Sequence, residues 1–151
     1  MNTRPDPNCS GSSFGLLIRQ VRDALWARIE HELQRSGHGL TFSQYITLKK
    51  LAAGVASATD LARAAEMSPG AMTRVLDKLE SAGLIARVAD PEDRRALHIH
   101  MTDAGHAIWG DVQQCGMRVL ERAFDGMDEN EQQLLTRLLE KARTNLALTD
   151  E

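Results

Sequence analysis

The feature that most constrains the fold is residues 59–102, where two short helical patterns and two β-type runs follow one another with few residues between them. The run T-D-L-A-R-A-A-E-M predicts a short helix with Thr59 as its N-cap and Asp60 at its positive end. Ser68-Pro69 predicts the start of the next helix, because serine can cap free N–H groups and proline is tolerated at the first helical position. The sequence therefore predicts two helices joined by a tight turn.

The second of these helices has two chemically different faces. Its apolar residues recur at helical spacing, which predicts one buried side: Met72, Val75, Leu76 and Leu79. The other side carries small and hydrogen-bonding residues, which would allow close approach to base edges in a DNA major groove: Ser68, Gly70, Thr73, Arg74 and Lys78. We expect Arg74, with Ser68 and Thr73, to contact base edges or phosphate, and Lys78 to contact the DNA backbone.

A hairpin is predicted after this helix. The runs L-I-A-R-V (84–88) and L-H-I-H-M (97–101) have β character, and the charged, turn-rich segment A-D-P-E-D-R-R-A separates them. Leu97, Ile99 and Met101 would face one way, and His98 and His100 the other. Two helices followed by a hairpin form the winged helix-turn-helix plan. The predicted fold class is thus mainly α with a small β-hairpin.

Long apolar-striped helices are predicted on both sides of this head, which spans about 41–102. The stripe of residues 13–36 runs from Phe14 to Leu33, and Thr41 is the expected N-cap of a further helix over 42–53. Two more helices are expected within 103–148, one that ends at about Asp125 and a last one that starts in the run G-M-D-E-N-E (126–131). Residues 1–12 are predicted to be a mobile tail, and 13–148 a single domain. The wide stripes predict that the two ends of the chain pack against each other and against a second subunit, giving a homodimer.

Composition sets outer bounds on function. With 151 residues, 42% apolar and 26% charged, the chain is typical of one soluble domain. Its net charge of −3 means that DNA binding would depend on where the basic residues lie. No apolar run approaches the roughly 20 residues that span a bilayer, and the N-terminus does not resemble a signal peptide, so we expect a cytoplasmic protein without membrane contact.

Residues 68–105 resemble the multiple-antibiotic-resistance regulator (MarR) family. The motifs are a D-P-x-D-R-R wing, the preceding L-x-x-x-G-L-I-x-R and the following T-x-x-G, and the helix order fits the family from about Ser13 to Leu148. The resemblance implies a homodimeric winged-helix transcription factor. Such factors are usually repressors of a nearby operon, released from DNA by a small aromatic or phenolic ligand or by oxidation.

The D-x-R pattern of the family's wing matches Asp93, Arg94 and Arg95. The resemblance implies that Asp93 orients Arg95, and that Arg95 enters the DNA minor groove. An arginine suits a narrow, electronegative groove, and a neighbouring carboxylate can hold its guanidinium. Arg94 and Arg87 would then contact phosphates, which adds affinity without sequence information. A solvated charged face is the alternative interpretation.

The family's ligand site implies four candidates for an effector pocket on the first, second and fifth helices: Trp26, His31, Tyr45 and Trp109. For each residue taken singly, a place in the core or at an interface is the simpler interpretation. Thiol-based redox sensing through Cys9 or Cys115 is an alternative mode of regulation, although neither cysteine occupies the family's sensor position near the start of the first long helix, and inert thiols are the simpler interpretation.

Other functional classes receive less support. His98 and His100 have a spacing that metals use, but no further ligand completes a local site, so neither a metal nor another cofactor is predicted. No convergent set of nucleophile, base and electrophile indicates an enzyme. A helical protein-interaction module that does not bind DNA remains the other alternative. The charged hairpin tip is the feature that such a module would not need.

Overall fold

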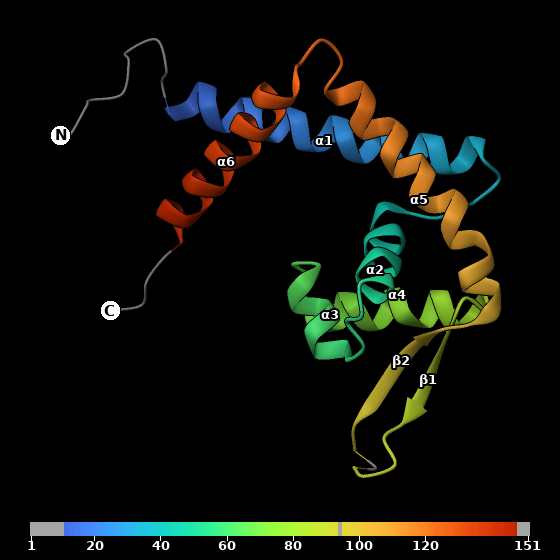
Figure 1. Cartoon of the computed structure of the whole chain (residues 1–151). Helices are drawn as coiled ribbons and strands as arrows, with labels where there is room; N and C mark the ends of the chain where they lie inside the picture. The colour runs from blue at the N-terminus through green and yellow to red at the C-terminus, as the bar shows by residue number, and fades with distance from the viewer. Residues whose placement is uncertain (1–10, 94, 148–151) are drawn as a thin grey trace. The chain divides into compact units, whose positions relative to one another are not determined.

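The computed structural model describes residues 11–93 and 95–147. The chain is mainly α-helical with one two-stranded sheet, as predicted. Its elements follow in the order α1 (Gly11–Arg35), α2 (Phe42–Ala52), α3 (Ala58–Ala64), α4 (Pro69–Ser81), β1 (Ile85–Ala89), β2 (Leu97–Met101), α5 (Asp103–Ala123) and α6 (Glu129–Leu146) (Figure 1). The chain divides into two compact units between Val119 and Leu120, inside α5, and each unit is described by itself.

Helix α2 begins as the sequence predicts. The Thr41 side chain accepts a hydrogen bond from the Gln44 N–H, and the Gln44 side chain accepts one from the Thr41 N–H, which completes a capping box. Tyr45 and Leu48 of α2 are buried. The Glu30 carboxylate of α1 accepts a hydrogen bond from the Phe42 N–H at 2.7 Å, so a side chain of the long first helix also holds the start of α2.

The prediction that Thr59 caps the third helix is wrong. Helix α3 begins earlier, at Ala58, and its N-cap is Ser57, whose hydroxyl accepts from the Asp60 N–H at 3.0 Å. The reason lies in the wing, because Ser57 is held in an extended conformation by a bridge to His98 of β2. An N-cap needs this non-helical backbone, and Thr59 lies inside the helix.

Helix α4 confirms its predicted start and its two faces. The Ser68 hydroxyl accepts from the Ala71 N–H at 3.2 Å, and Pro69 occupies the first turn. Met72, Leu76 and Leu79 are buried, together with Leu61 and Ala62 of α3. The two helices therefore share one core, which holds the exposed side of α4 in a set orientation.

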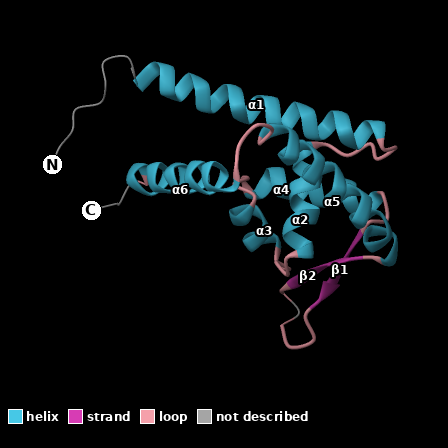
Figure 2. Cartoon of the chain, turned by 45° about the horizontal axis from the view of Figure 1, so that its top comes forward, coloured by secondary structure: helices cyan, strands magenta, loops and turns pink. Residues whose placement is uncertain are grey.

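The hairpin pairs β1 with β2 in antiparallel register, with Ile85 opposite Met101 and Ala89 opposite Leu97. Ile99 is buried as predicted, whereas Leu97, expected on the same face, is 49% exposed because it lies beside the turn at the tip of the hairpin. The Ile99 N–H donates to the Ala56 carbonyl at 2.7 Å. This bond joins the middle of β2 to the segment before α3, and the strands project away from the helices (Figure 2).

The T-x-x-G motif has a structural explanation at the start of α5. The Thr102 hydroxyl accepts from the Gly105 N–H at 3.1 Å and itself donates to the Gly83 carbonyl. A Cβ at position 105 would collide with the Leu84 carbonyl oxygen. The threonine caps α5 and fastens it to the turn after α4, and the glycine allows the close approach.

Helix α6 lies in the second unit and starts with a capping box between Asp128 and Glu131, which confirms the predicted acid-rich first turn. None of its residues is buried, although four leucines line one side: Leu134, Leu135, Leu138 and Leu139. No helix among the described residues is long and apolar enough to cross a membrane.

Candidate nucleic-acid interface

The exposed side of α4 presents the residues predicted to meet DNA: Ser68, Gly70, Thr73, Arg74 and Lys78. Thr73 donates to the Pro69 carbonyl at 3.0 Å, which orients its hydroxyl on the helix surface. A Cβ at Gly70 would meet nothing within 4 Å, so packing does not require this glycine. Its bare backbone leaves the first turn of α4 open to close approach by another molecule.

The side chain of Arg87, which was expected to contact phosphate, is bonded to two carboxylates of the protein itself. Its guanidinium donates to the Asp77 carboxylate at 2.7 Å and to the Glu80 carboxylate at 3.1 Å. These contacts raise the pKa of Arg87, the hydrogen bond to Asp77 most strongly. Both carboxylates belong to α4, so Arg87 joins β1 to that helix instead of extending into solvent.

The wing tip is ordered by carboxylates that bind backbone N–H groups. Asp93 accepts from the Arg95 N–H at 3.0 Å, and Asp90 accepts from the Glu92 N–H at 2.8 Å. The Ala96 N–H in turn donates to the Asp93 carbonyl at 3.0 Å. Asp93 thus holds the main chain of Arg95, whereas the sequence led us to expect a contact with its guanidinium. Arg94 lies outside the described residues.

His98 supports the same loop from β2. Its Nε2 lies 2.8 Å from the second carboxylate oxygen of Asp90. The backbone N–H of Glu92 and then this histidine lower the pKa of Asp90. His100 is exposed, with its ring centroid 6.3 Å from that of His98. In the part of the chain that the structure describes, no three His, Cys, Asp or Glu side chains gather as a metal site would require.

Three of the four effector-pocket candidates belong to one series of aromatic rings that includes Phe42, which the sequence analysis missed. Trp26 stacks on Phe42 with ring centroids 4.5 Å apart, Phe42 lies 6.1 Å from Tyr45, and Tyr45 lies 6.5 Å from Trp109. The series joins α1, α2 and α5. Trp26 is 44% exposed, and the guanidinium of Arg22 covers its ring at 5.2 Å.

His31, the fourth candidate, is exposed on α1, and no ring contact of this residue is found among the described residues. Trp26 and its neighbour Arg22 leave one end of the aromatic series open to solvent. Tyr45, farther along the series, is buried, and Trp109 at the other end is half-buried. The Arg22–Trp26 pair could have been suspected from the sequence, since residues four apart share a helix face.

Cys115 is fully buried in α5. Its sulfur lies 3.3 Å from both the Ser36 hydroxyl and the Arg118 guanidinium, and Arg118 also approaches the Glu32 carboxylate at 3.4 Å. Burial limits the access of oxidants, which favours the interpretation of an inert thiol that links α5 to α1. Cys9 lies outside the described residues.

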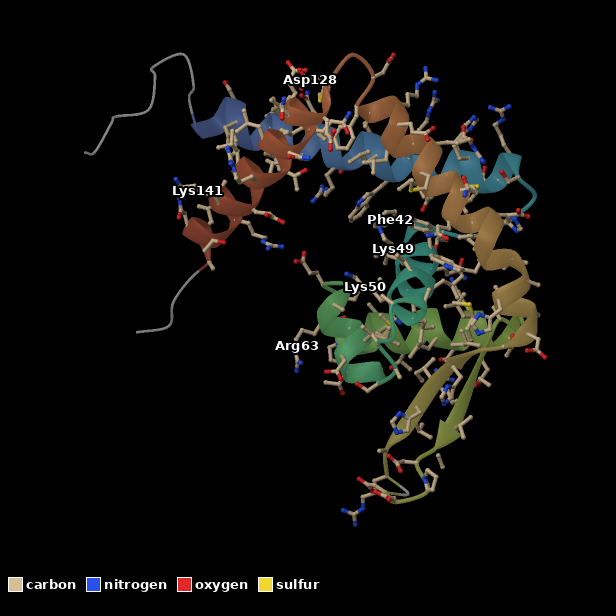
Figure 3. The ribbon with its side chains drawn as sticks, viewed as in Figure 1. Phe42, Lys49, Lys50, Arg63, Asp128 and Lys141 are labelled. Carbon is tan, nitrogen blue, oxygen red and sulfur yellow. The ribbon has the colours of Figure 1, made fainter. Side chains whose placement is uncertain are left out.

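Sequence reasoning also missed basic residues outside α4 and the wing. Lys49 and Lys50 of α2 and Arg63 of α3 lie on the same side of the head (Figure 3). Arg63 is paired with Asp60 at 3.2 Å and is largely exposed. The paired lysines are visible in the sequence, but their position on the same side as Arg63 depends on how α2 packs against α3.

Comparison with known proteins decides the family. The MarR family model matches residues 40–97, which include the helix-turn-helix and most of the hairpin. The HTH-type transcriptional repressor Rv2887 of Mycobacterium tuberculosis is 34% identical over 130 residues, covering 85% of this chain and 91% of that protein. The chain belongs to the MarR family. It is a transcriptional regulator with the family's winged helix-turn-helix fold.

Two solved MarR-family structures add functional context. A cysteine-to-serine mutant of E. coli MarR, complexed with operator DNA, is 25% identical with a TM-score of 0.78, covering 86% of this chain and 93% of that one. BpsR of Bordetella bronchiseptica, whose DNA binding is regulated by 6-hydroxynicotinic acid, is also 25% identical, with a TM-score of 0.76 and coverage of 85% and 91%.

Proposed function

We propose that this MarR-family chain is a repressor that binds a pseudo-palindromic operator as a homodimer. The observation that carries the proposal is the exposed side of α4, where small and hydrogen-bonding residues stand opposite a fully packed face. In a dimer, two such helices would enter successive major grooves about 34–36 Å apart on one side of the DNA. The operator complex of the related E. coli protein supports this use of the fold.

Within each subunit, the contacts divide by role. Arg74, with Ser68 and Thr73, reads base edges or nearby phosphates, and Gly70 lets the helix approach. Arg95 enters the minor groove from the wing tip, where the bond from its N–H to Asp93 holds the backbone. Lys78 and Arg94 contact phosphates, which contributes affinity and salt dependence. A regulator with these partners acts in the cytoplasm.

A second copy of the chain would bury the apolar side chains that the long helices expose. α1 exposes five large apolar residues in its first half: Phe14, Leu16, Leu17, Ile18 and Val21. α6 exposes a leucine stripe and buries nothing. Exposed apolar surface of this extent is typical of an interface. We therefore keep residues 13–148 as one domain whose outer helices, 13–36 and 103–148, form the dimer.

Release from DNA is assigned to a small aromatic or phenolic ligand. The exposed ring of Trp26, backed by Phe42 and covered by Arg22, offers a stacking surface beside a positive charge. Trp26, Tyr45 and Trp109 would contribute to the pocket, with His31 at its edge. The regulation of the related B. bronchiseptica protein by 6-hydroxynicotinic acid supports an aromatic ligand.

The test combines DNA binding with mass measurement. A labelled duplex from the region upstream of the chain's own gene is titrated with protein at low salt, beside a duplex of scrambled sequence. Light scattering gives the mass of the free protein. We expect a dimer that prefers the upstream duplex. A monomer that shifts neither duplex would refute the proposal and favour the alternative of a helical protein-interaction module.

A further inference from the structure

Arg87 is anchored by two ion pairs. It stands in the middle of β1, opposite Ile99 of β2, and its side chain is only 21% exposed. Its two guanidinium nitrogens bind two different carboxylates, Asp77 at 2.7 Å and Glu80 at 3.1 Å. A planar guanidinium that holds two partners at once is fixed in direction. While both bonds are made, the guanidinium is directed at α4 and away from free solvent.

The two carboxylates lie on the half of α4 that follows the proposed DNA-reading residues. Asp77 and Glu80 are themselves 59% and 44% exposed, so their charges are not hidden by burial. Lys78 is the neighbouring cation on this part of the helix. Without Arg87, this part of α4 would carry two negative charges, on Asp77 and Glu80, and one positive charge, on Lys78. The two carboxylates would then lie close to the phosphates that Lys78 is proposed to contact. Like charges close together cost binding energy.

The same contacts attach the wing to α4. β2 is held to the rest of the head by the backbone bond from Ile99 to Ala56. The side chain of Arg87 provides the corresponding attachment for β1, because both of its partners, Asp77 and Glu80, belong to α4. The angle between α4 and the wing therefore depends on Arg87, and with it the distance between a major-groove and a minor-groove contact.

We propose that Arg87 is a positioning residue that cancels the charge of Asp77 and Glu80 and docks β1 on α4, and that it does not itself bind a phosphate. The inference rests on the proposed operator binding. In this proposal α4 and the wing form one rigid unit. The ion cluster of Arg87, Asp77 and Glu80 lowers the negative charge on the side of this unit that faces the DNA phosphates. The two interpretations of Arg87 make opposite predictions for a variant that removes all three charges.

The experiment compares Arg87→Gln with the triple variant Arg87→Gln/Asp77→Asn/Glu80→Gln. Amides retain the capacity to hydrogen-bond between β1 and α4 while the charges are gone. Binding to the upstream duplex is measured by fluorescence anisotropy at several KCl concentrations. Arg35→Gln, which removes an exposed arginine paired with Glu32 at the end of α1, controls for the loss of one positive charge outside the head.

We expect Arg87→Gln to weaken binding at least about tenfold, because two uncompensated carboxylates become free to repel phosphates. The triple variant should recover to within about threefold of the wild type with an unchanged salt slope, since no phosphate contact is lost. Arg35→Gln should bind like the wild type. Thermal unfolding followed by circular dichroism checks that each variant is folded.

Two results would overturn the inference while leaving operator binding intact. One is an unchanged affinity of Arg87→Gln. The other is a triple variant that stays as weak as the single one, and a salt slope that also falls by about 1 per subunit would identify a direct phosphate contact instead. Absence of binding by the wild-type protein would refute the proposed function itself, together with this inference.

Discussion

The head and the long helices around it differ in how completely they bury their apolar side chains. Ten residues between Leu40 and Ile99 are buried hydrophobics, drawn from every element of the head: Leu40, Tyr45, Leu48, Leu61, Ala62, Met72, Leu76, Leu79, Ile85 and Ile99. In the described part of α1 only Ile29 and Leu33 are buried hydrophobics, and α6 has no buried residue. α5 is intermediate, since Val112, Cys115 and Val119 are buried in it. The head is a closed core, whereas the first half of α1 and α6 leave their apolar side chains exposed.

The contrast separates two tasks. A closed core gives α4 and the wing a defined geometry within one chain, which is what groove contacts require. Open apolar faces give the flanking helices a reason to associate with another chain, which is what a two-fold operator requires. Variants in the two regions should therefore produce different failures, and the following predictions test that separation.

The largest effect is expected from Leu138→Glu in the leucine stripe of α6. Leu138 is 53% exposed in the single chain, so the substitution should leave the head folded. In a dimer the new carboxylate would be buried without a partner, at a cost of several kcal/mol, so the dimer dissociation constant should rise at least about a hundredfold. Light scattering should find monomers, and operator affinity should fall with them.

Gln133→Glu is the matched control, because it adds the same charge on the side of α6 away from the leucines. Gln133 is exposed and bonds to Glu129 one turn earlier. This variant should remain dimeric and bind DNA. A dimeric Leu138→Glu protein would contradict the assignment of the α6 stripe to the interface.

The next largest effect is expected from Arg95→Ala at the wing tip. Loss of a minor-groove arginine should weaken operator binding about tenfold to a hundredfold and lower the salt slope by about 1 per subunit. The mass of the free protein should not change, because Arg95 is an exposed residue of the head. Anisotropy titrations at several salt concentrations provide both quantities.

Arg95→Lys tests the groove geometry separately from the charge. Lysine keeps the positive charge but lacks the planar fork of the guanidinium. We expect most of the salt slope to return with only part of the affinity. An Arg95→Ala protein with an unchanged slope would place the wing outside the groove.

The sequence predicted most of the head because its signals are local. Ser68-Pro69 marks the start of α4, and Met72, Leu76 and Leu79 recur at helical spacing. The error at Thr59 has a non-local cause, since the extended conformation of Ser57 depends on pairing with His98, about forty residues later. No pattern near position 57 carries that information.

The candidate site was predictable to a smaller degree for the same reason. Exposed positions on α4 follow from helical periodicity alone. The partners of Arg87 and the stacking of Phe42 on Trp26 depend on how β1 meets α4 and how α1 meets α2. Such contacts between distant segments are visible only in the folded chain.

A third prediction concerns the junction between the head and α5. Gly105→Ala would press a Cβ onto the Leu84 carbonyl oxygen, and this backbone atom cannot move without shifting the turn after α4. Overpacking of this kind should lower the free energy of unfolding by about 1–3 kcal/mol. Urea unfolding followed by circular dichroism measures it.

Gly110→Ala, on the same helix, is the control with the opposite sign. A Cβ there meets nothing within 4 Å. Replacing glycine inside a helix should raise the free energy of unfolding by about 0.5–1 kcal/mol. Equal effects at the two glycines would mean that α5 does not dock closely on the Leu84 carbonyl.

The smallest effect is expected at Ser57, and it tests whether this residue is the N-cap of α3 within the head. Ser57→Ala removes the oxygen that accepts from the Asp60 N–H, which should lower the free energy of unfolding by about 1 kcal/mol. Thr59→Ala should change it by less than about 0.5 kcal/mol, because Thr59 is exposed within the first turn and alanine favours the helix. The two variants remove a hydroxyl two residues apart, so their difference in urea unfolding isolates the cap. A larger loss for Thr59→Ala would mean that the helix starts where the sequence alone suggested and that the bridge from Ser57 to His98 does not set its first turn.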